Sequence, residues 1–252
     1  MAKVIVVANW KMHPSSFVEA RRLLESTKKA LERTRRVFLI MAPPALFLRE
    51  LTKSTTRRSS TLAFAVQSAR AESEGAFTGA ISLTQAKDAR VAYAIIGHAE
   101  RRAQGESDTD VHAQVMAALT LRLTPIVCVG EKERTQDGGY FMHVREQLRE
   151  ALVDVKKTQV KKIIIAYEPV WAIGAPQPMA PRDMHEMSIF IRKTLVEAHG
   201  AGAMDTRILY GGAIDETNAP AMIREGDIAG FLVGRASADA RKISALLSAL
   251  SS

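Results

Sequence analysis

Apolar residues occur along this chain in eight short runs, each followed by a longer segment that mixes apolar and charged residues. The runs cover residues 3–10, 36–43, 61–68, 91–98, 124–131, 162–169, 206–213 and 230–236. Each run is almost continuously apolar, whereas a strand with one face in solvent alternates apolar and polar residues. The runs therefore predict strands that are buried on both faces of a parallel sheet.

The segments between the runs have the spacing of amphipathic helices. The clearest are residues 15–34 and 183–200, and the second closes with His199 and Gly200, a common helix end. Eight strands alternating with helices over about 250 residues predict an α/β fold, a (β/α)8 barrel. An open, doubly wound sheet would use fewer strands and carry G-x-G-x-x-G after the first, where this chain reads ANWKMH. No break in composition marks a second domain, so we expect one barrel over residues 1–252.

Polar residues and glycines gather where the predicted strands end. They are Asn9, Lys11, Gln67, His98, Glu100, Glu131, Glu168, Tyr210, Gly211, Gly212, Gly234 and Arg235. Because the carboxyl ends of barrel strands meet at one mouth, we expect these residues to lie close together. Glycine turns after the last two strands commonly bind phosphate through backbone N–H groups. The pattern therefore predicts a site for a small phosphorylated anion, with a carboxylate and a histidine facing each other.

Net charge narrows the class of partner. The chain carries a formal charge of +8 and has a pI near 9.7. Its basic residues are scattered, acids lie among several of them, and the 6% of aromatic residues form no cluster. We therefore expect no nucleic-acid partner. The positive field that remains favours an anionic substrate.

Cysteine content and hydropathy bear on the compartment. The single cysteine, Cys128, fits a reducing environment. The first apolar run is too short and too soon interrupted for a signal peptide, and nowhere do about 18 apolar residues run together. We expect a cytoplasmic protein with no membrane partner.

Metal and nucleotide motifs are incomplete. His98 and Glu100 match half of a zinc deaminase motif, but the P-C-x-x-C half is missing. His185-Glu186 lacks a second histidine at metalloprotease spacing, and the chain has no Walker motif. We predict neither metal nor cofactor. Taken singly, His98 and Glu168 could both be structural, and Glu131 is interpreted as structural.

Seven segments resemble one enzyme family. They are ANWKMH (8–13), GAFTGAIS (75–82), IIGHAERR (95–102), IVCVGE (126–131), AYEPVWAIG (166–174), ILYGGAI (208–214) and FLVGRAS (231–237). The chain is similar to the triosephosphate isomerases along essentially its whole length. The resemblance implies a TIM barrel that interconverts dihydroxyacetone phosphate and glyceraldehyde 3-phosphate in glycolysis and gluconeogenesis.

The resemblance also implies roles for the residues that react. Glu168 would remove the proton next to the substrate carbonyl, and a carboxylate in a water-poor pocket is a stronger base. His98 would donate a hydrogen bond to the enediolate as a neutral ring, because the short helix AERR that follows disfavours its charged form. Lys11 would supply positive charge and Asn9 would orient the substrate, with Glu100 as a secondary polar partner.

Binding groups and a lid follow from the same resemblance. The backbone N–H groups of Gly174, Ala213, Gly234 and Arg235 would hold the phosphate. The segment after Glu168 would be a lid that excludes water from the intermediate. Its closure would depend on Trp171 packing and on the Tyr210 hydroxyl, which would bond a backbone N–H near Met179.

Six positions depart from the family pattern. The family has serine at Ala99 and Ala213, threonine-glycine at Ala175-Pro176, glycine at Arg235 and glutamate at Ala80. Pro176 has no N–H and Ala213 no hydroxyl, so one lid latch is expected to be lost at both ends. If Arg235 needs a positive φ, its backbone would be strained by about 1 kcal/mol or more.

An assembly is implied as well. The loop GAFTGA would place Thr78 in the pocket of a second copy, near its Asn9 and Glu100, in a homodimer. Because Ala80 replaces a glutamate that pairs with Arg101, we expect a weaker dimer, with Glu106 as the remaining partner of Arg101. Two alternatives stay open: a sister isomerase for a longer ketose phosphate, and a non-catalytic barrel that binds phosphate ligands.

Overall fold

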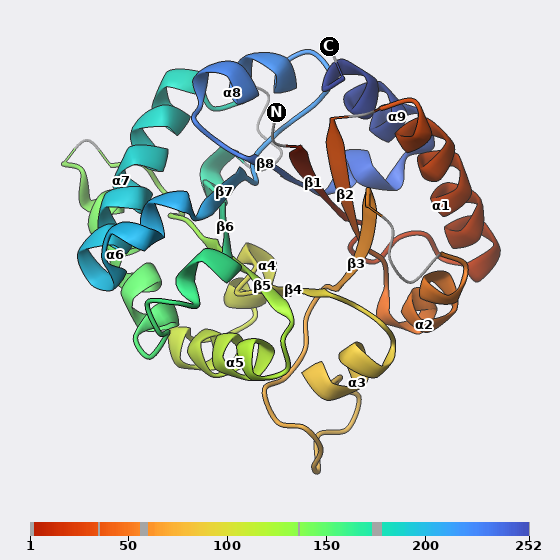
Figure 1. The fold of residues 1–252 in the computed structure, drawn as a ribbon, viewed down its shortest axis with the longest axis horizontal. Helices are drawn as coiled ribbons and strands as arrows, with labels where there is room; N and C mark the ends of the chain where they lie inside the picture. Colours follow the sequence, from red (N-terminus) through yellow and green to blue (C-terminus); the bar gives the residue numbers. More distant parts are fainter. Residues whose placement is uncertain (1–2, 35, 56–59, 136, 173–177, 252) are drawn as a thin grey trace.

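Eight parallel strands close into a barrel in the computed structural model, which describes residues 3–34, 36–55, 60–135, 137–172 and 178–251. The strands are β1 (Val4–Asn9), β2 (Val37–Ala42), β3 (Leu62–Val66), β4 (Tyr93–Ile96), β5 (Thr124–Val129), β6 (Ile164–Tyr167), β7 (Arg207–Tyr210) and β8 (Gly230–Val233). Each strand pairs with the next in the sequence, and β8 pairs with β1 (Figure 1). The predicted (β/α)8 barrel is confirmed, and all eight apolar runs contain a strand.

Helices form the outer ring around the strands, apart from the short α4, which lies over the barrel (Figure 1). They are α1 (Phe17–Glu32), α2 (Ala45–Lys53), α3 (Leu83–Asp88), α4 (Ala99–Ala103), α5 (Asp108–Thr120), α6 (Gly139–Leu152), α7 (Pro181–His199), α8 (Ala219–Glu225) and α9 (Ala240–Ala249). The two helices expected from the pattern are α1 and α7. Ser16 caps α1 by accepting the Glu19 N–H, and Gly200 ends α7 with φ +82.

Two apolar clusters explain why the strands lack polar alternation. One fills the inside of the barrel: Ile5, Val7, Ile40, Ala42, Ala65, Ile95, Ile126, Cys128, Ile164, Ala166, Leu209 and Leu232. The other contains the intervening strand residues, such as Val6 and Ala8, together with the inner faces of the helices. Because both faces of every strand are buried, both sets of alternating positions are apolar.

The inward rows of the strands continue into the mouth of the barrel. Ile5 and Val7 are followed in their row by Asn9, and Ile164 and Ala166 by Glu168. Leu232 is followed in the same way by Gly234. The period of two along a strand therefore brings these residues to one end of the barrel interior.

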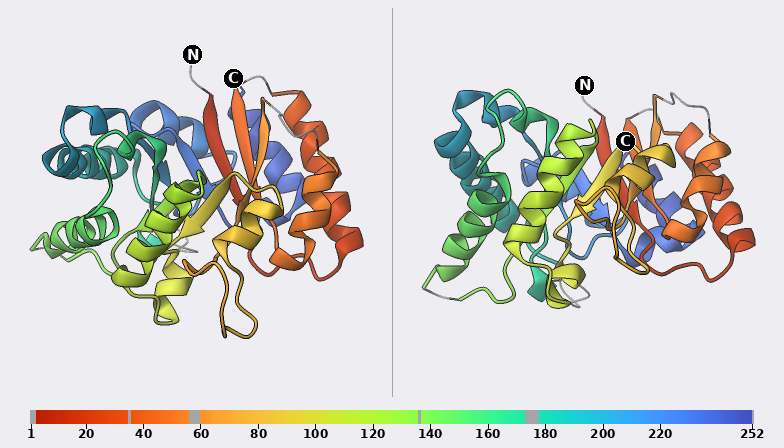
Figure 2. Two further views of the ribbon diagram at one scale, coloured as in Figure 1. Left: turned by 60° about the horizontal axis from the view of Figure 1, so that its bottom comes forward. Right: turned by 90° about the horizontal axis from the view of Figure 1, so that it is seen from below.

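A long loop between β3 and α3 projects from the body of the barrel (Figures 1 and 2). Residues 72–80 of this loop are all exposed. Among the described helices, none combines the length and hydrophobicity that a membrane crossing requires.

Candidate active site

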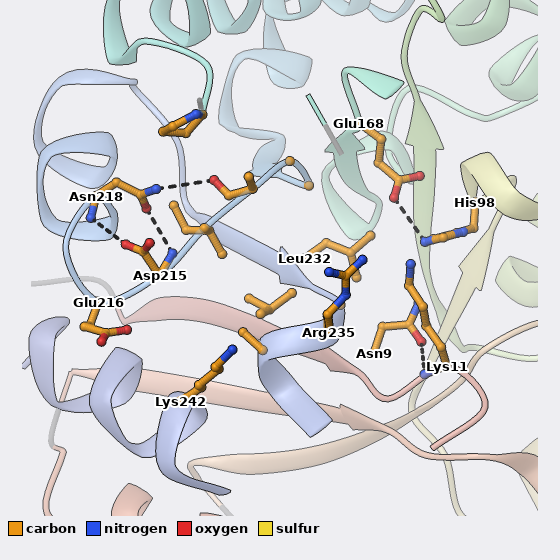
Figure 3. A pocket seen from close by; sticks show the side chains of 18 residues that line it. Asn9, Lys11, His98, Glu168, Asp215, Glu216, Asn218, Leu232, Arg235 and Lys242 are labelled. Atoms are coloured by element: carbon orange, nitrogen blue, oxygen red, sulfur yellow. Dashed lines mark hydrogen bonds and ion pairs between the residues drawn. The ribbon is translucent and has the colours of Figure 1, made fainter. Parts of the chain in front are cut away.

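A cavity of about 440 Å³ opens at the carboxyl ends of the strands (Figure 3). Nine residues predicted from the sequence line it: Asn9, Lys11, His98, Glu168, Gly211, Gly212, Ala213, Gly234 and Arg235. They come from the loops after β1, β4, β6, β7 and β8. The barrel therefore brings together residues that lie as far apart in the sequence as Asn9 and Arg235.

Glu168 is a buried carboxylate held by two donors. Its Oε2 accepts the Ala99 N–H at 3.0 Å, and its Oε1 lies 3.2 Å from His98 Nε2. Only 3% of the side chain is exposed. Gly211 of the next strand passes so close that a Cβ there would lie 2.7 Å from Glu168 Cγ. This turn needs glycine because the carboxylate occupies the space of a side chain.

His98 faces Glu168 with a defined ring nitrogen. It caps α4, and its Nδ1 accepts the Glu100 N–H at 3.2 Å. A ring nitrogen accepts only when it carries no proton, so the proton of the neutral ring lies on Nε2. That N–H is directed toward the Glu168 carboxylate and into the cavity (Figure 3). His98 is therefore set up as a hydrogen-bond donor to an oxygen bound there.

Cys128 belongs to the interior cluster of the barrel and lies near Glu168. Burial, and then the negative charge of Glu168, raise the pKa of its thiol well above the ordinary value. The thiol stays protonated and adds no second negative charge next to Glu168.

Lys11 is held in a strained backbone conformation, with φ +53. Asn9 Oδ1 accepts the Lys11 N–H at 3.0 Å, and Gln67 Nε2 donates to the Lys11 carbonyl at 2.8 Å. These two bonds fix the loop that carries Lys11. The second bond explains why a polar residue, Gln67, stands at the end of β3. The side chain of Lys11 therefore reaches the cavity from a rigid support.

The Lys11 ammonium forms a salt bridge with Glu100, 2.6 Å from Nζ to Oε1. Burial alone would raise the pKa of Glu100, but Lys11, together with His98, holds this pKa below its ordinary value. Glu100 is therefore a carboxylate at neutral pH, and it compensates the charge of Lys11.

Two turns present unused backbone donors to the cavity. Within the described part of the chain, the N–H groups of Ala213, Gly234 and Arg235 donate to no acceptor. Asn218 Nδ2 donates to the Ala213 carbonyl at 3.4 Å, and Ser237 Oγ to the Gly234 carbonyl at 2.7 Å. These side chains hold the carbonyls while the N–H groups stay available, an arrangement that suits an anion.

Arg235 does not have the strained backbone that a positive φ would impose. Among the described residues, the non-glycine positions with positive φ are Lys11, Arg90, Arg122 and Asp227. Arg235 is the first residue of a short 3₁₀ helix, Arg235–Ala238. The expected strain at this position is therefore absent, because the helical turn begins with an ordinary φ.

The segments before and after the expected lid are anchored separately. Glu131 accepts from the Tyr167 hydroxyl and from Trp171 Nε1, both at 2.8 Å. The carboxylate is 2% exposed, which agrees with its interpretation as structural. Beyond the expected lid, the Met179 N–H donates to the Tyr210 hydroxyl at 3.4 Å. Burial raises the pKa of Tyr210 to about 12.

Other predicted residues lie outside this cavity or outside the described residues. Gly174, Ala175 and Pro176 belong to the segment that the structure does not describe. Thr78 is exposed on the loop after β3, and no partner chain is present to test its role. Glu100 contacts the site only through Lys11 and His98.

Several cavity residues were not predicted from the sequence. Asp215, Glu216 and Asn218 lie between β7 and α8, and Lys242 lies in the first turn of α9. These residues do not stand at the ends of predicted strands, where the candidate residues lie. A lysine in the first turn of the helix after a phosphate-binding turn is the signal that would have revealed Lys242.

Comparison with known proteins shows similarity to one enzyme family along almost the whole chain. The triosephosphate isomerase family model matches residues 4–250. Triosephosphate isomerase of Moorella thermoacetica is 36% identical over 249 residues, covering 98% of both chains. That of Endomicrobium trichonymphae is 36% identical over 250 residues, again covering 98% of both. The chain therefore belongs to the triosephosphate isomerase family.

Proposed function

We propose that Glu168, His98 and Lys11 carry out the interconversion of dihydroxyacetone phosphate and D-glyceraldehyde 3-phosphate, the aldose–ketose isomerisation of this family. Glu168 takes a proton from the carbon next to the substrate carbonyl, which leaves an enediolate. It then returns a proton to the neighbouring carbon, while the hydroxyl proton passes from one enediolate oxygen to the other, so no atom is lost and no electron leaves the substrate. His98 donates its Nε2–H to the oxygens of the enediolate, on which the charge develops.

The observation that carries the proposal is the pairing of Glu168 with His98 in the same cavity as the free N–H groups. Their facing atoms are 3.2 Å apart. A barrel that only bound phosphate would need Lys11 and the two turns, but not a buried carboxylate facing a histidine N–H. The pair therefore favours proton transfer over simple ligand binding.

Substrate binding must rearrange this pair. In the structure both oxygens of Glu168 are occupied, one by the Ala99 N–H and one by His98. To reach a substrate carbon, Glu168 exchanges these donors for the substrate, and His98 then turns its N–H to a substrate oxygen. The lid encloses the intermediate meanwhile, since exclusion of water protects an enediolate that can otherwise lose its phosphate.

A coupled assay tests the function. It is run in both directions on the two triose phosphates and then on five- and six-carbon ketose phosphates. We expect turnover of the triose phosphates. Turnover of a longer ketose phosphate without turnover of the triose phosphates would favour the sister isomerase. If no substrate is turned over but phosphate still binds, the non-catalytic barrel would be favoured.

We also propose that the protein works as a homodimer in the cytoplasm. Met12 and Leu46, which follow β1 and β2, are 90% and 91% exposed, and Phe77 after β3 is exposed as well. Because these strands are neighbours, the apolar residues lie on one sector of the rim. Large exposed apolar side chains in one area are typical of an interface. Met12 directly follows Lys11, so a partner that covered it would also fix the catalytic loop.

A further inference from the structure

Two positive side chains on the cavity wall form no hydrogen bond or ion pair within the described part of the chain: Arg235 and Lys242. The third, Lys11, is paired with Glu100. The carboxylates differ too, since Glu168 is held by its two donors, while Glu216 forms no bond to a described residue.

The carboxylate of Asp215 is likewise occupied. It accepts from the Thr217 hydroxyl, and from the N–H groups of Thr217 and Asn218. Hydrogen bonds from neutral groups do not cancel charge, so the described cavity lining carries three cations, Lys11, Arg235 and Lys242, and three carboxylates, Glu168, Asp215 and Glu216. Glu168 and Asp215 are held in place by their donors, whereas Arg235 and Lys242 are in no ion pair with a described residue and can turn to a bound anion.

Arg235 is the better placed of the two cations. It directly follows Gly234, and its own N–H is one of the free donors of the turn. Figure 3 shows its side chain directed into the cavity, toward the end that holds Lys11 and Glu168, while Lys242 enters from the opposite end. Gly234 lies so close to Lys11 that a Cβ there would be 3.1 Å from Lys11 Cε. The turn, Lys11 and Arg235 thus surround one part of the cavity.

We propose that the Arg235 guanidinium is an additional side-chain ligand of the substrate phosphate and strengthens its binding in this site. The inference rests on the proposed isomerase function and extends it to a residue outside the family pattern. A guanidinium presents paired N–H donors that match two phosphate oxygens, and its charge is permanent. Lys242 adds a point charge that attracts the dianion from the far end of the cavity.

Arg235 is exposed, so we expect a moderate contribution. Removal of its charge should weaken phosphate binding about tenfold, which corresponds to about 1.4 kcal/mol. The effect should shrink as salt is added, because salt screens charges in contact with solvent.

The test compares Arg235→Met, Arg235→Lys and Arg235→Gly with the wild type. Calorimetry gives the dissociation constant of inorganic phosphate, and the coupled assay gives KM and kcat on both triose phosphates. The matched control is Arg241→Met, because Arg241 is an exposed arginine of α9 outside the cavity lining. We expect Arg235→Met and Arg235→Gly to raise the phosphate dissociation constant and KM about tenfold, with most of the loss in KM. Arg235→Lys should be intermediate, and the control unchanged.

Three results would overturn the proposal. The first is wild-type phosphate affinity in both Arg235→Met and Arg235→Gly. The second is tighter binding, which would mean that the side chain obstructs the site. The third is an equal loss in Arg241→Met, which would assign the effect to net charge alone. A wild type that binds phosphate but isomerises neither triose phosphate would refute the proposed function instead. In that case, the phosphate dissociation constants from calorimetry would still test the role of Arg235 in phosphate binding.

Discussion

Glu168 and His98 are already in contact in the structure, with 3.2 Å between their facing atoms. The carboxylate is buried, yet its charge is matched by donors: the Ala99 N–H and the Nε2–H of His98. A buried carboxylate without such partners would be costly. These donors satisfy the carboxylate before substrate binds, and in the proposed reaction Glu168 exchanges them for the substrate.

Glu168→Gln should remove the reaction but not the fold. Glutamine has the size of glutamate and can still accept the Ala99 N–H through its amide oxygen. It cannot take a proton from carbon, and general-base catalysis is worth about 100- to 10,000-fold. We expect kcat to fall by that factor or more, with inorganic phosphate bound as in the wild type by calorimetry.

The control for this change is Glu197→Gln, an exposed glutamate of α7, which should leave kcat within about twofold of the wild type because surface substitutions have small effects. A Glu168→Gln enzyme that kept a tenth of the activity would remove Glu168 from its role.

Buried tyrosines give the protein a limit at high pH. The pKa of Tyr210 is raised by burial from 10.0 to about 12, and that of Tyr167 is raised by burial and by Glu131. Between pH 10 and these raised pKa values, the folded state keeps the tyrosine protons, whereas the unfolded state loses them. The free energy of unfolding should therefore begin to fall above about pH 9, where the Cys128 thiol ionises in the unfolded state but stays protonated in the folded state. It should fall more steeply above about pH 10, by about 1.4 kcal/mol per pH unit for each of the two tyrosines.

Denaturant unfolding from pH 8 to pH 11.5 measures this decline. Tyr210→Phe removes one of the two tyrosines, so its decline with pH should be shallower than that of the wild type. An identical slope in the variant would show that Tyr210 does not contribute.

At the scale of the elements, the strands were predictable and the cavity was only partly so. Each strand is buried on both faces, so its sequence carries a continuous apolar signal, and polar residues such as Asn9 and Glu168 mark its end. Lys242 is not at a strand end, and only its place in the first turn of the helix after the Gly234 turn separates it from the many other lysines of amphipathic helices. The φ of Arg235 depends on the helical turn that follows it, which the sequence does not reveal.

We expect the departures from the family pattern at Pro176 and Ala213 to weaken closure of the lid. Its described flank is held by the Tyr210 hydroxyl, and Ala213 offers no hydroxyl as a second anchor. Pro176 lies outside the described residues, and its ring nitrogen carries no hydrogen. One such bond contributes about 0.5–1.5 kcal/mol, so we expect at most about a tenfold deficit in kcat.

Restoring one end of the latch should therefore accomplish little. Ala213→Ser alone supplies an acceptor for which no donor is present. Together with Pro176→Gly it should reduce the leakage of intermediate to methylglyoxal by more than the sum of the two single variants. The measurement is the ratio of methylglyoxal formed to substrate isomerised. If the serine variant alone performs as well as the double variant, the latch does not have two ends.

At the scale of the whole molecule, the barrel alone leaves its catalytic rim uncovered. Arg101 is half-exposed, and within its own chain its guanidinium lies 3.0 Å from the Gln104 side-chain oxygen and 3.9 Å from the Glu106 carboxylate. The second contact agrees with Glu106 as the remaining partner of Arg101. The loop of residues 72–80 and the side chains of Met12 and Leu46 are exposed on the same sector. A second copy would bury them and bring Thr78 to the partner's site.

Light scattering combined with the activity assay tests this assembly. We expect an active dimer that dissociates more readily than its relatives, because Ala80 cannot pair with Arg101. Ala80→Glu should restore an ion pair and lower the dissociation constant of the dimer, by severalfold for a contribution of about 1 kcal/mol.

Thr78→Arg should place a bulky charge at the contact, yield monomers and reduce kcat, because the loop that carries Lys11 and Met12 would lose its cover. An active wild-type monomer at micromolar concentration would refute the requirement for a dimer. Monomers of Thr78→Arg with full activity would show that dimerisation and catalysis are independent.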